Sequence, residues 1–139
     1  MSMTFLAILG LNCGLTTAEL NDHAEALSVP VKFTYEANLR THSGFLPVLL
    51  GGAEAGVETY FIENPDFLDS LPPNEAIDKS NAPVVQFRFG GNLKEGATAL
   101  YIGYILAEKC QAILFEPEGG DYMAPVTAKQ GAEAMASYE

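Results

Sequence analysis

Twelve consecutive residues without a charged side chain, 96–107, constrain the fold of this chain more than any other feature. The stretch follows Asn92, a good helix N-cap, and Glu95 occupies the capping-box position three residues later. A soluble chain can hide an uncharged helix of this length only inside its core. We therefore expect residues 96–107 to form a buried central helix. The sheet that packs against it is expected to contribute Phe5, Ile8, Val85, Phe87 and Ile113.

Hydrophobic periodicity predicts the other elements. Thr16 and Glu19 form a second capping box, and the helix that they start is expected to end before Pro30. A third, alanine-rich helix is expected to begin near Val126. Apolar runs predict strands at 4–11, 31–35, 45–50, 57–62, 84–89 and 112–115.

Glycine and proline residues indicate where the loops and turns between these runs lie. Gly51, Gly52 and Gly56 indicate a hairpin with a loop of roughly four to six residues. Residues 64–81 are rich in proline and acids, which predicts a surface excursion with one helical turn near Phe67 and Leu68. Residues 116–122 are expected to be a polar turn.

The resulting order, β-α-β-β-β-β-α-β-α, predicts an α+β fold. We expect a mixed, mainly antiparallel sheet with two helices packed on one face and a C-terminal helix, related to the split βαβ plan. A chain of 139 residues suits one domain, 1–139, because two separate cores would each be small.

The charge balance excludes several classes of partner. Eighteen acidic against seven basic residues leave a net charge of −11. Nucleic acids and anionic membranes bind proteins through positive charge, so neither is expected as a partner. The apolar start, residues 3–11, has no basic residue before Lys32 and no cleavage pattern after it. We therefore expect a cytoplasmic protein.

Cys13 carries the one enzymatic hypothesis that the sequence allows. It stands in the predicted strand–helix turn, and a helix N-terminus lowers a thiol pKa. With His23 or His42 as base, it would be the nucleophile of a small cysteine-dependent enzyme. Neighbouring basic residues are missing, and Leu15 stands where a phosphate-binding loop needs lysine. We expect no enzyme, and we expect Cys13 and Cys110 to be free thiols that fill apolar space.

Acidic residues also crowd one turn, where Glu116, Glu118 and Asp121 could offer oxygen ligands to a cation. Their spacing does not match a calcium loop, and the chain has no cluster with zinc spacing. No metal and no cofactor are expected.

The acids are distributed unevenly. Between Arg40 and Lys79 the chain has no Lys or Arg but seven acidic residues: Glu54, Glu58, Glu63, Asp66, Asp69, Glu75 and Asp78. One interpretation is that this charge only keeps an apolar domain soluble. The other is a docking face for a basic protein partner, since loops carry binding groups and apolar anchors such as Leu68 accompany the acids. The partner-binding residues on this second interpretation are Glu58, Tyr60, Glu63, Asp66, Phe67 and Asp69.

Three segments carry a resemblance: SGFLPV at 43–48 with the hairpin after it, VQFRFGG at 85–91, and FEPEGG at 115–120. Across residues 43–136 the chain resembles small bacterial proteins, some of which are similar to immunity partners of polymorphic toxins. This resemblance implies a protein that binds and inhibits a toxin domain, and it transfers no binding residue.

We therefore expect a cytoplasmic acidic binding protein, an immunity or inhibitor protein that neutralises a basic toxin or enzyme domain by occlusion. Two alternatives stay open, the cysteine-dependent enzyme and an accessory subunit of a larger complex. The oligomeric state is not predicted.

Overall fold

The helix predicted from the charge-free stretch crosses one face of a seven-stranded sheet in the computed structural model, which describes residues 3–10, 13–78 and 82–137. The strands are β1 (Met3–Ile8), β2 (Val31–Phe33), β3 (Gly44–Leu50), β4 (Ala53–Ile62), β5 (Val84–Phe89), β6 (Ile113–Glu116) and β7 (Asp121–Met123). The helices are α1 (Thr17–Ala26), α2 (Leu93–Cys110) and α3 (Pro125–Ser137), with a 3-10 helix η1 (Pro65–Ser70) between β4 and β5.

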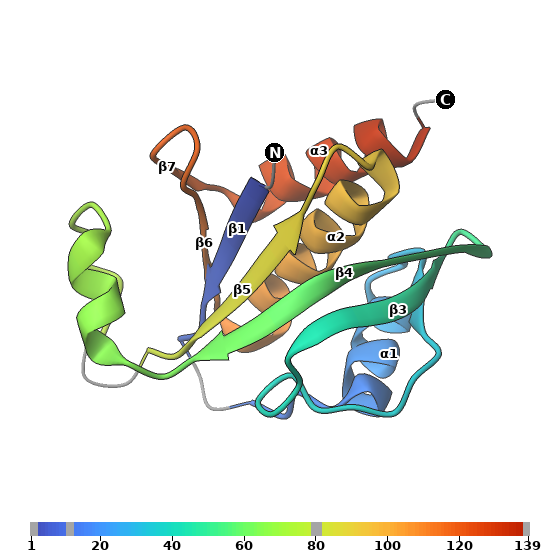
Figure 1. Cartoon of the computed structure of the whole chain (residues 1–139), viewed down its shortest axis with the longest axis horizontal. Helices are drawn as coiled ribbons and strands as arrows, with labels where there is room; N and C mark the ends of the chain where they lie inside the picture. The colour runs from blue at the N-terminus through green and yellow to red at the C-terminus, as the bar shows by residue number, and fades with distance from the viewer. Residues whose placement is uncertain (1–2, 11–12, 79–81, 138–139) are drawn as a thin grey trace.

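The strand order is β2-β3-β4-β5-β1-β6-β7, and every pairing in the described chain is antiparallel. Figure 1 shows the open sheet with the three helices behind it and η1 at one end. The predicted α+β class is confirmed. Among the described residues, no helix has both the length and the apolar character needed to cross a membrane.

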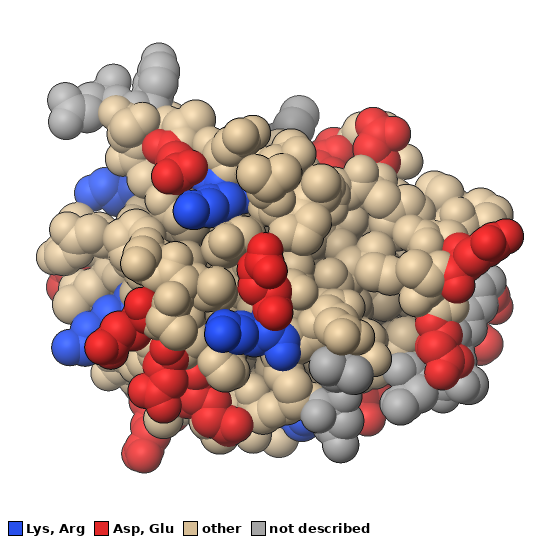
Figure 2. All heavy atoms as spheres, turned by 180° about the vertical axis from the view of Figure 1, so that it is seen from behind, with Lys and Arg blue, Asp and Glu red and all other residues tan. Residues whose placement is uncertain are grey.

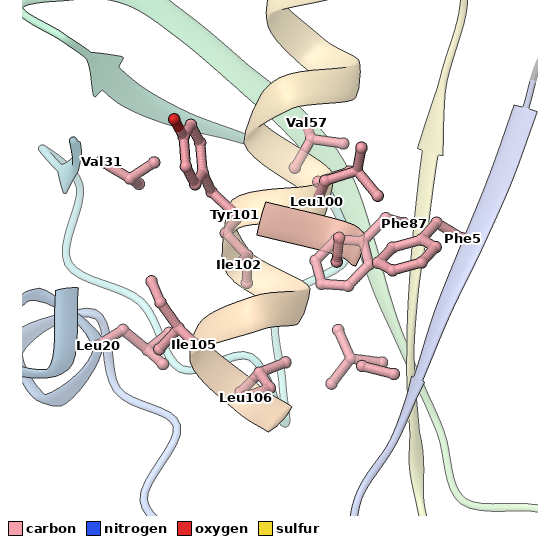
Figure 3. Close-up of a cluster of buried hydrophobic side chains, with 14 of the residues drawn as sticks. Phe5, Leu20, Val31, Val57, Phe87, Leu100, Tyr101, Ile102, Ile105 and Leu106 are labelled. Carbon is pink, nitrogen blue, oxygen red and sulfur yellow. The ribbon is translucent and has the colours of Figure 1, made fainter. Parts of the chain in front are cut away.

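Helix α2 organises the main core. It packs against β1, β4 and β5, while α3 lies along its length and α1 contacts its side. Figure 3 shows Phe5 and Phe87 of the sheet beside the helix and Leu20 of α1 facing Ile105. Gly103 permits this approach, because a Cβ there would lie 2.5 Å from the ring of Phe5.

Two of the residues expected against this helix lie elsewhere. Ile8 and Ile113 pair across β1 and β6, and both belong to a second apolar cluster, away from the α2 core. The alternation of strand side chains explains the correction, because Phe5 and Ile8 are three residues apart and therefore face opposite sides of the sheet.

Local signals place most of the element ends. The Thr16 side chain accepts a hydrogen bond from the amide of Glu19, and Asn92 does the same for Glu95. The predicted hairpin loop was too long, because β4 already begins at Ala53. Only Gly51 and Gly52 connect the strands, and both have positive φ, as a type I′ turn requires.

The excursion between β4 and β5 is more firmly packed than its sequence indicates. It contains the expected helical turn as η1, but Leu68 is only 3% exposed and belongs to the second apolar cluster with Leu6, Ile8, Val84 and Phe115. The expected polar turn 116–122 is also partly strand, since β7 pairs with β6. The hydroxyl of Tyr122 in β7 donates to the carbonyl of Pro72 and ties the excursion to the sheet.

Candidate functional site

The sheet face opposite the helices carries side chains in rows that run across the strands. Strand register places Tyr60, Gln86, Leu6, Phe115 and Tyr122 in one such row, each opposite the next on a neighbouring strand. Directly opposite side chains lie about 4.5–5.5 Å apart at Cβ, so the middle row is a continuous line of neighbouring side chains, in which Leu6 and Phe115 are buried.

A second row runs parallel to the middle row on the same face, two residues away along each strand. Glu58 lies opposite Arg88, and Arg88 lies opposite Thr4. The amide of Thr4 donates to the carboxylate of Glu118, 3.2 Å away, so this charged row ends in the turn between β6 and β7. Carboxylates therefore occupy both ends of the row.

A groove of about 490 Å³ lies over the middle row, between η1 and the β6–β7 turn. Leu6 and Phe115 are apolar floor residues that are shielded from solvent, and Gln86 adds an amide. Phe67 and Ser70 of η1 line one side. The groove is thus an apolar hollow with a few polar groups at its margins, which is the usual composition of a binding site.

Exposed acids surround this end of the molecule. We call them the acidic end: Glu63, Asp66, Asp69, Glu75, Asp78, Glu118 and Asp121. Figure 2, seen from the helix side, shows acidic side chains and no Lys or Arg among the described residues at this end, while acidic and basic side chains are intermingled over the rest of this face. Lys79 lies outside the described residues. Bases are therefore missing from this end of the visible face, whereas exposed acids such as Glu25, Glu108 and Glu133 also lie on the helices.

Glu58 and Tyr60, two of the expected partner-binding residues, interact with each other. The Tyr60 hydroxyl donates to Glu58 Oε1 at 2.5 Å. This hydrogen bond to a carboxylate raises the pKa of Tyr60 above its ordinary value of 10.0. Tyr60 is half-buried, so only part of its side chain is accessible.

The other expected residues cluster around η1. Glu63, Asp66 and Asp69 are exposed, and Asn64 caps η1 by accepting from the amide of Asp66. Phe67 is half-buried and lines the groove. The structure thus brings Phe67 near Gln86, the residue opposite Tyr60. Leu68, named beside them as an exposable anchor, is instead buried, so that part of the expectation was wrong.

No protein-family model, no curated protein and no solved structure shows a significant similarity to this chain. The site is therefore interpreted from its own geometry.

Sequence reasoning missed the groove floor, Thr4, Leu6, Gln86 and Phe115. The alternation within 84–89 did predict that Gln86 and Arg88 share a face. The identity of the neighbouring strands depends on long-range register, which no local pattern contains.

The other half of the same sheet face is uncovered. Phe45 is 52% exposed, and its ring lies across Gly56, where a Cβ would meet it at 2.4 Å. A hollow of about 590 Å³ beside it also involves Lys94 and Glu95 at the start of α2. Charges of both signs line this hollow, so it shows no preference for one kind of partner.

Cys13 and Cys110 form a disulfide, with their Cα atoms 5.8 Å apart. The expectation of two free thiols was therefore wrong. The sequence showed no need for a covalent link, but the fold places the end of α2 beside the segment that precedes α1, within disulfide distance. A Cys13 thiolate would require reduction of this bond. Arg40, distant in sequence, donates to the Cys13 carbonyl at 3.4 Å.

The histidines named as possible bases have other surroundings. The Nε2 atom of His42 lies 3.0 Å from the carbonyl oxygen of Phe45, and the imidazole ring meets Tyr35 edge-on. His23 lies in the last turn of α1. The geometry offers no support for a Cys–His pair among these described residues.

The acidic turn between β6 and β7 is stabilised by hydrogen bonds within the turn. The Glu116 carboxylate accepts hydrogen bonds from the amides of Glu118 and Gly119. Within the described ranges, no group of three or more His, Cys, Asp or Glu side chains is arranged to hold a metal ion. The turn acts as a structural element that presents Glu118 to β1.

Proposed function

We propose that this protein is an inhibitor that binds a basic protein domain at its acidic end and occludes it. The observation that carries the proposal is the gathering of exposed acids, with no Lys or Arg of the described residues in the view from the helix side, at the end of the molecule where the groove lies. Net charge alone is enough to keep a protein soluble, wherever the charged residues lie. A docking face needs the charged residues to be gathered beside a hollow that can receive the partner.

The first role of the acids is to attract the basic partner electrostatically before contact. A surface of one charge sign raises the association rate with a partner of the opposite sign, and salt screens this effect over about 8 Å at physiological ionic strength. Apolar contacts in the middle of the interface would then slow dissociation. The resemblance to immunity partners of polymorphic toxins makes a bacterial toxin domain the favoured partner.

The compartment depends on the redox state of the Cys13–Cys110 pair. The sequence favours the cytoplasm, where thiols are kept reduced, whereas a disulfide is typical of oxidising compartments. The proposed interface does not include either cysteine, so the proposal holds in both compartments. Alkylation of free thiols in the native host, followed by mass spectrometry, gives the redox state directly.

A capture experiment tests the proposal. The immobilised chain is exposed to an extract of its native host, and bound proteins are eluted with rising salt and identified. We expect a protein rich in Lys and Arg that elutes as ionic strength approaches about 1 M, where the Debye length falls to about 3 Å. Expression of that protein alone should stop growth of a test host, and co-expression with this chain should restore it.

Two variants with equal charge changes provide the control. The acidic-end variant carries Glu63→Lys, Asp66→Lys and Asp69→Lys. The helix-side variant carries Glu25→Lys, Glu108→Lys and Glu133→Lys, which are exposed acids on α1, α2 and α3. Only the acidic-end variant should lose the basic protein. Retention of the same protein by both variants, or the absence of any basic protein, would refute the proposal.

A further inference from the structure

We propose that a second copy of this chain docks on the uncovered half of the sheet, the outward face of β2, β3 and β4, and forms a two-fold symmetric dimer. We call this surface the dimer face. Figure 1 shows β3 and η1 on opposite sides of the molecule, and the strand order places β2, β3 and β4 away from β6 and β7. The inference therefore goes beyond the proposed function, because the acidic end takes no part in it.

The centre of the dimer face is apolar. Phe45, Pro47 and Leu49 alternate along β3 with residues of the main core, so all three point away from the helices. Phe45 is exposed, and the other two are half-buried. An apolar line of this kind gains free energy when a second apolar surface removes it from water.

Opposite charges lie on either side of Leu49. Strand register places Leu49 opposite Lys32 of β2 on one side and opposite Glu54 of β4 on the other. Lys32 and Glu54 are exposed, and in the described part of the chain neither side chain forms a hydrogen bond or an ion pair. The row is thus positive, apolar and negative across three neighbouring strands.

Other charges near this row lie further back. Lys94 and Glu95 of α2, one of each sign, line the hollow on the Glu54 side, and Glu25 of α1 lines a hollow on the Lys32 side. All three belong to helices, which lie behind the sheet in Figure 1. Lys32 and Glu54 are therefore the charges that a second sheet stacked on this face would meet.

Such a row favours neither a basic nor an acidic partner, but it is complementary to itself. A two-fold axis along β3, midway between two facing sheets, lays β2 of each copy over β4 of the other. Lys32 of one copy then meets Glu54 of the second, and the same contact is made twice. Packed sheets lie about 10 Å apart with their strands nearly aligned, a separation that these two side chains can bridge together.

The edge of β2 is less accessible to a second copy than the dimer face. The side chain of Asn21 donates to the Phe33 carbonyl and accepts a hydrogen bond from the Phe33 amide. These are backbone groups that an added strand would need. Extension of the sheet is therefore blocked at this point, which favours stacking of the faces.

The dimer should be reversible. The overlap comprises parts of three strands from each copy, which is small for a protein–protein interface. The net charge of −11 on each copy also opposes association. We expect the dimer fraction to rise with protein concentration in sedimentation velocity at physiological salt, which screens the repulsion between the copies.

Two single substitutions test the pairing. Lys32→Glu and Glu54→Lys each convert both attractive pairs into pairs of like charge, so each variant alone should be monomeric at concentrations where the wild type is dimeric. The two substitutions change the net charge in opposite directions, so a general effect of charge cannot explain the loss in both. An equimolar mixture of the two variants should form a heterodimer, because both attractive pairs are then restored. The double variant in one chain should also dimerise.

Lys109→Glu and Glu133→Lys are the matched controls, since both residues are exposed on α2 and α3. They should dimerise as the wild type does, and thermal unfolding checks that every variant folds. The dimer face is overturned by a wild type that stays monomeric as concentration rises, by single variants that still dimerise, by a mixture that stays monomeric, or by controls that lose the dimer. None of these results concerns capture of a basic protein, so this inference and the proposed function fail separately.

Discussion

Two buried threonines in this fold differ in whether their hydroxyl group has a hydrogen-bond partner. The hydroxyl of Thr59 on β4 is 1% exposed at residue level and, within the described chain, has no hydrogen-bond partner. The hydroxyl of Thr17 is also buried, but it accepts a hydrogen bond from the amide of Ala37 at 3.2 Å. Buried polar groups are costly only when they lack a partner.

The same substitution at these two threonines should therefore have opposite effects. Thr59→Val removes an unsatisfied group and should raise the free energy of unfolding by about 1 kcal/mol, whereas Thr17→Val should lower it by about 1 kcal/mol. Urea unfolding midpoints measure both. A loss of stability in Thr59→Val would mean that its hydroxyl has a partner in solution.

At the scale of elements, contact between α2 and β1 depends on a glycine. A Cβ at Gly103 would lie 2.5 Å from the Phe5 ring, which is held in the core beside Phe87. Gly103→Ala should lower the free energy of unfolding by about 1–3 kcal/mol, although alanine is the better helix former. Gly91→Ala, where a Cβ meets nothing within 4 Å, is the control. Equal stability of the two variants in urea would show that α2 lies further from β1.

The disulfide joins the segment that precedes α1 to the end of α2, across 97 residues of sequence. Closing so long a loop restricts the unfolded chain, so the bond should contribute about 2–5 kcal/mol. Wild-type protein should therefore unfold at a lower temperature in the presence of a dithiol reductant. A variant with Cys13→Ser and Cys110→Ala should unfold at that lower temperature with or without reductant. Identical melting of the wild type in both conditions would contradict the bond.

Elements with strong local signals could be predicted from the sequence, and those defined by distant pairing could not. Thr16, Asn92 and the alternation within 84–89 act within a few residues, so their helices and strand were predicted correctly. Strand β7 is only three residues long and is defined by its pairing with β6. The disulfide is defined by the position of the end of α2 relative to Cys13. Both are distant pairings, so neither was predicted.

The same distinction applies to the candidate site. Its acids could be predicted from the sequence because they are concentrated in one segment. Its groove could not, because Leu6, Gln86 and Phe115 come from three strands that only the sheet register brings together.

At the scale of the whole molecule, the central feature is the end formed by η1 and the β6–β7 turn. Its exposed side chains include seven acids, and the view from the helix side shows no Lys or Arg of the described residues there, whereas acids and bases are intermingled over the helices (Figure 2). Like charges held together repel one another, so this distribution is unfavourable for the isolated chain and favourable for a complex with a cationic surface.

The most direct test is the dissociation constant of the captured basic protein for the wild type, the acidic-end variant and the helix-side variant, measured at low and at physiological salt. We predict that the acidic-end variant binds about tenfold or more weakly at low salt, with most of the loss in the association rate. The helix-side variant should stay within about threefold of the wild type, because its substitutions lie outside the interface. Wild-type affinity of the acidic-end variant at low salt, or an equal loss in both variants, would contradict the account.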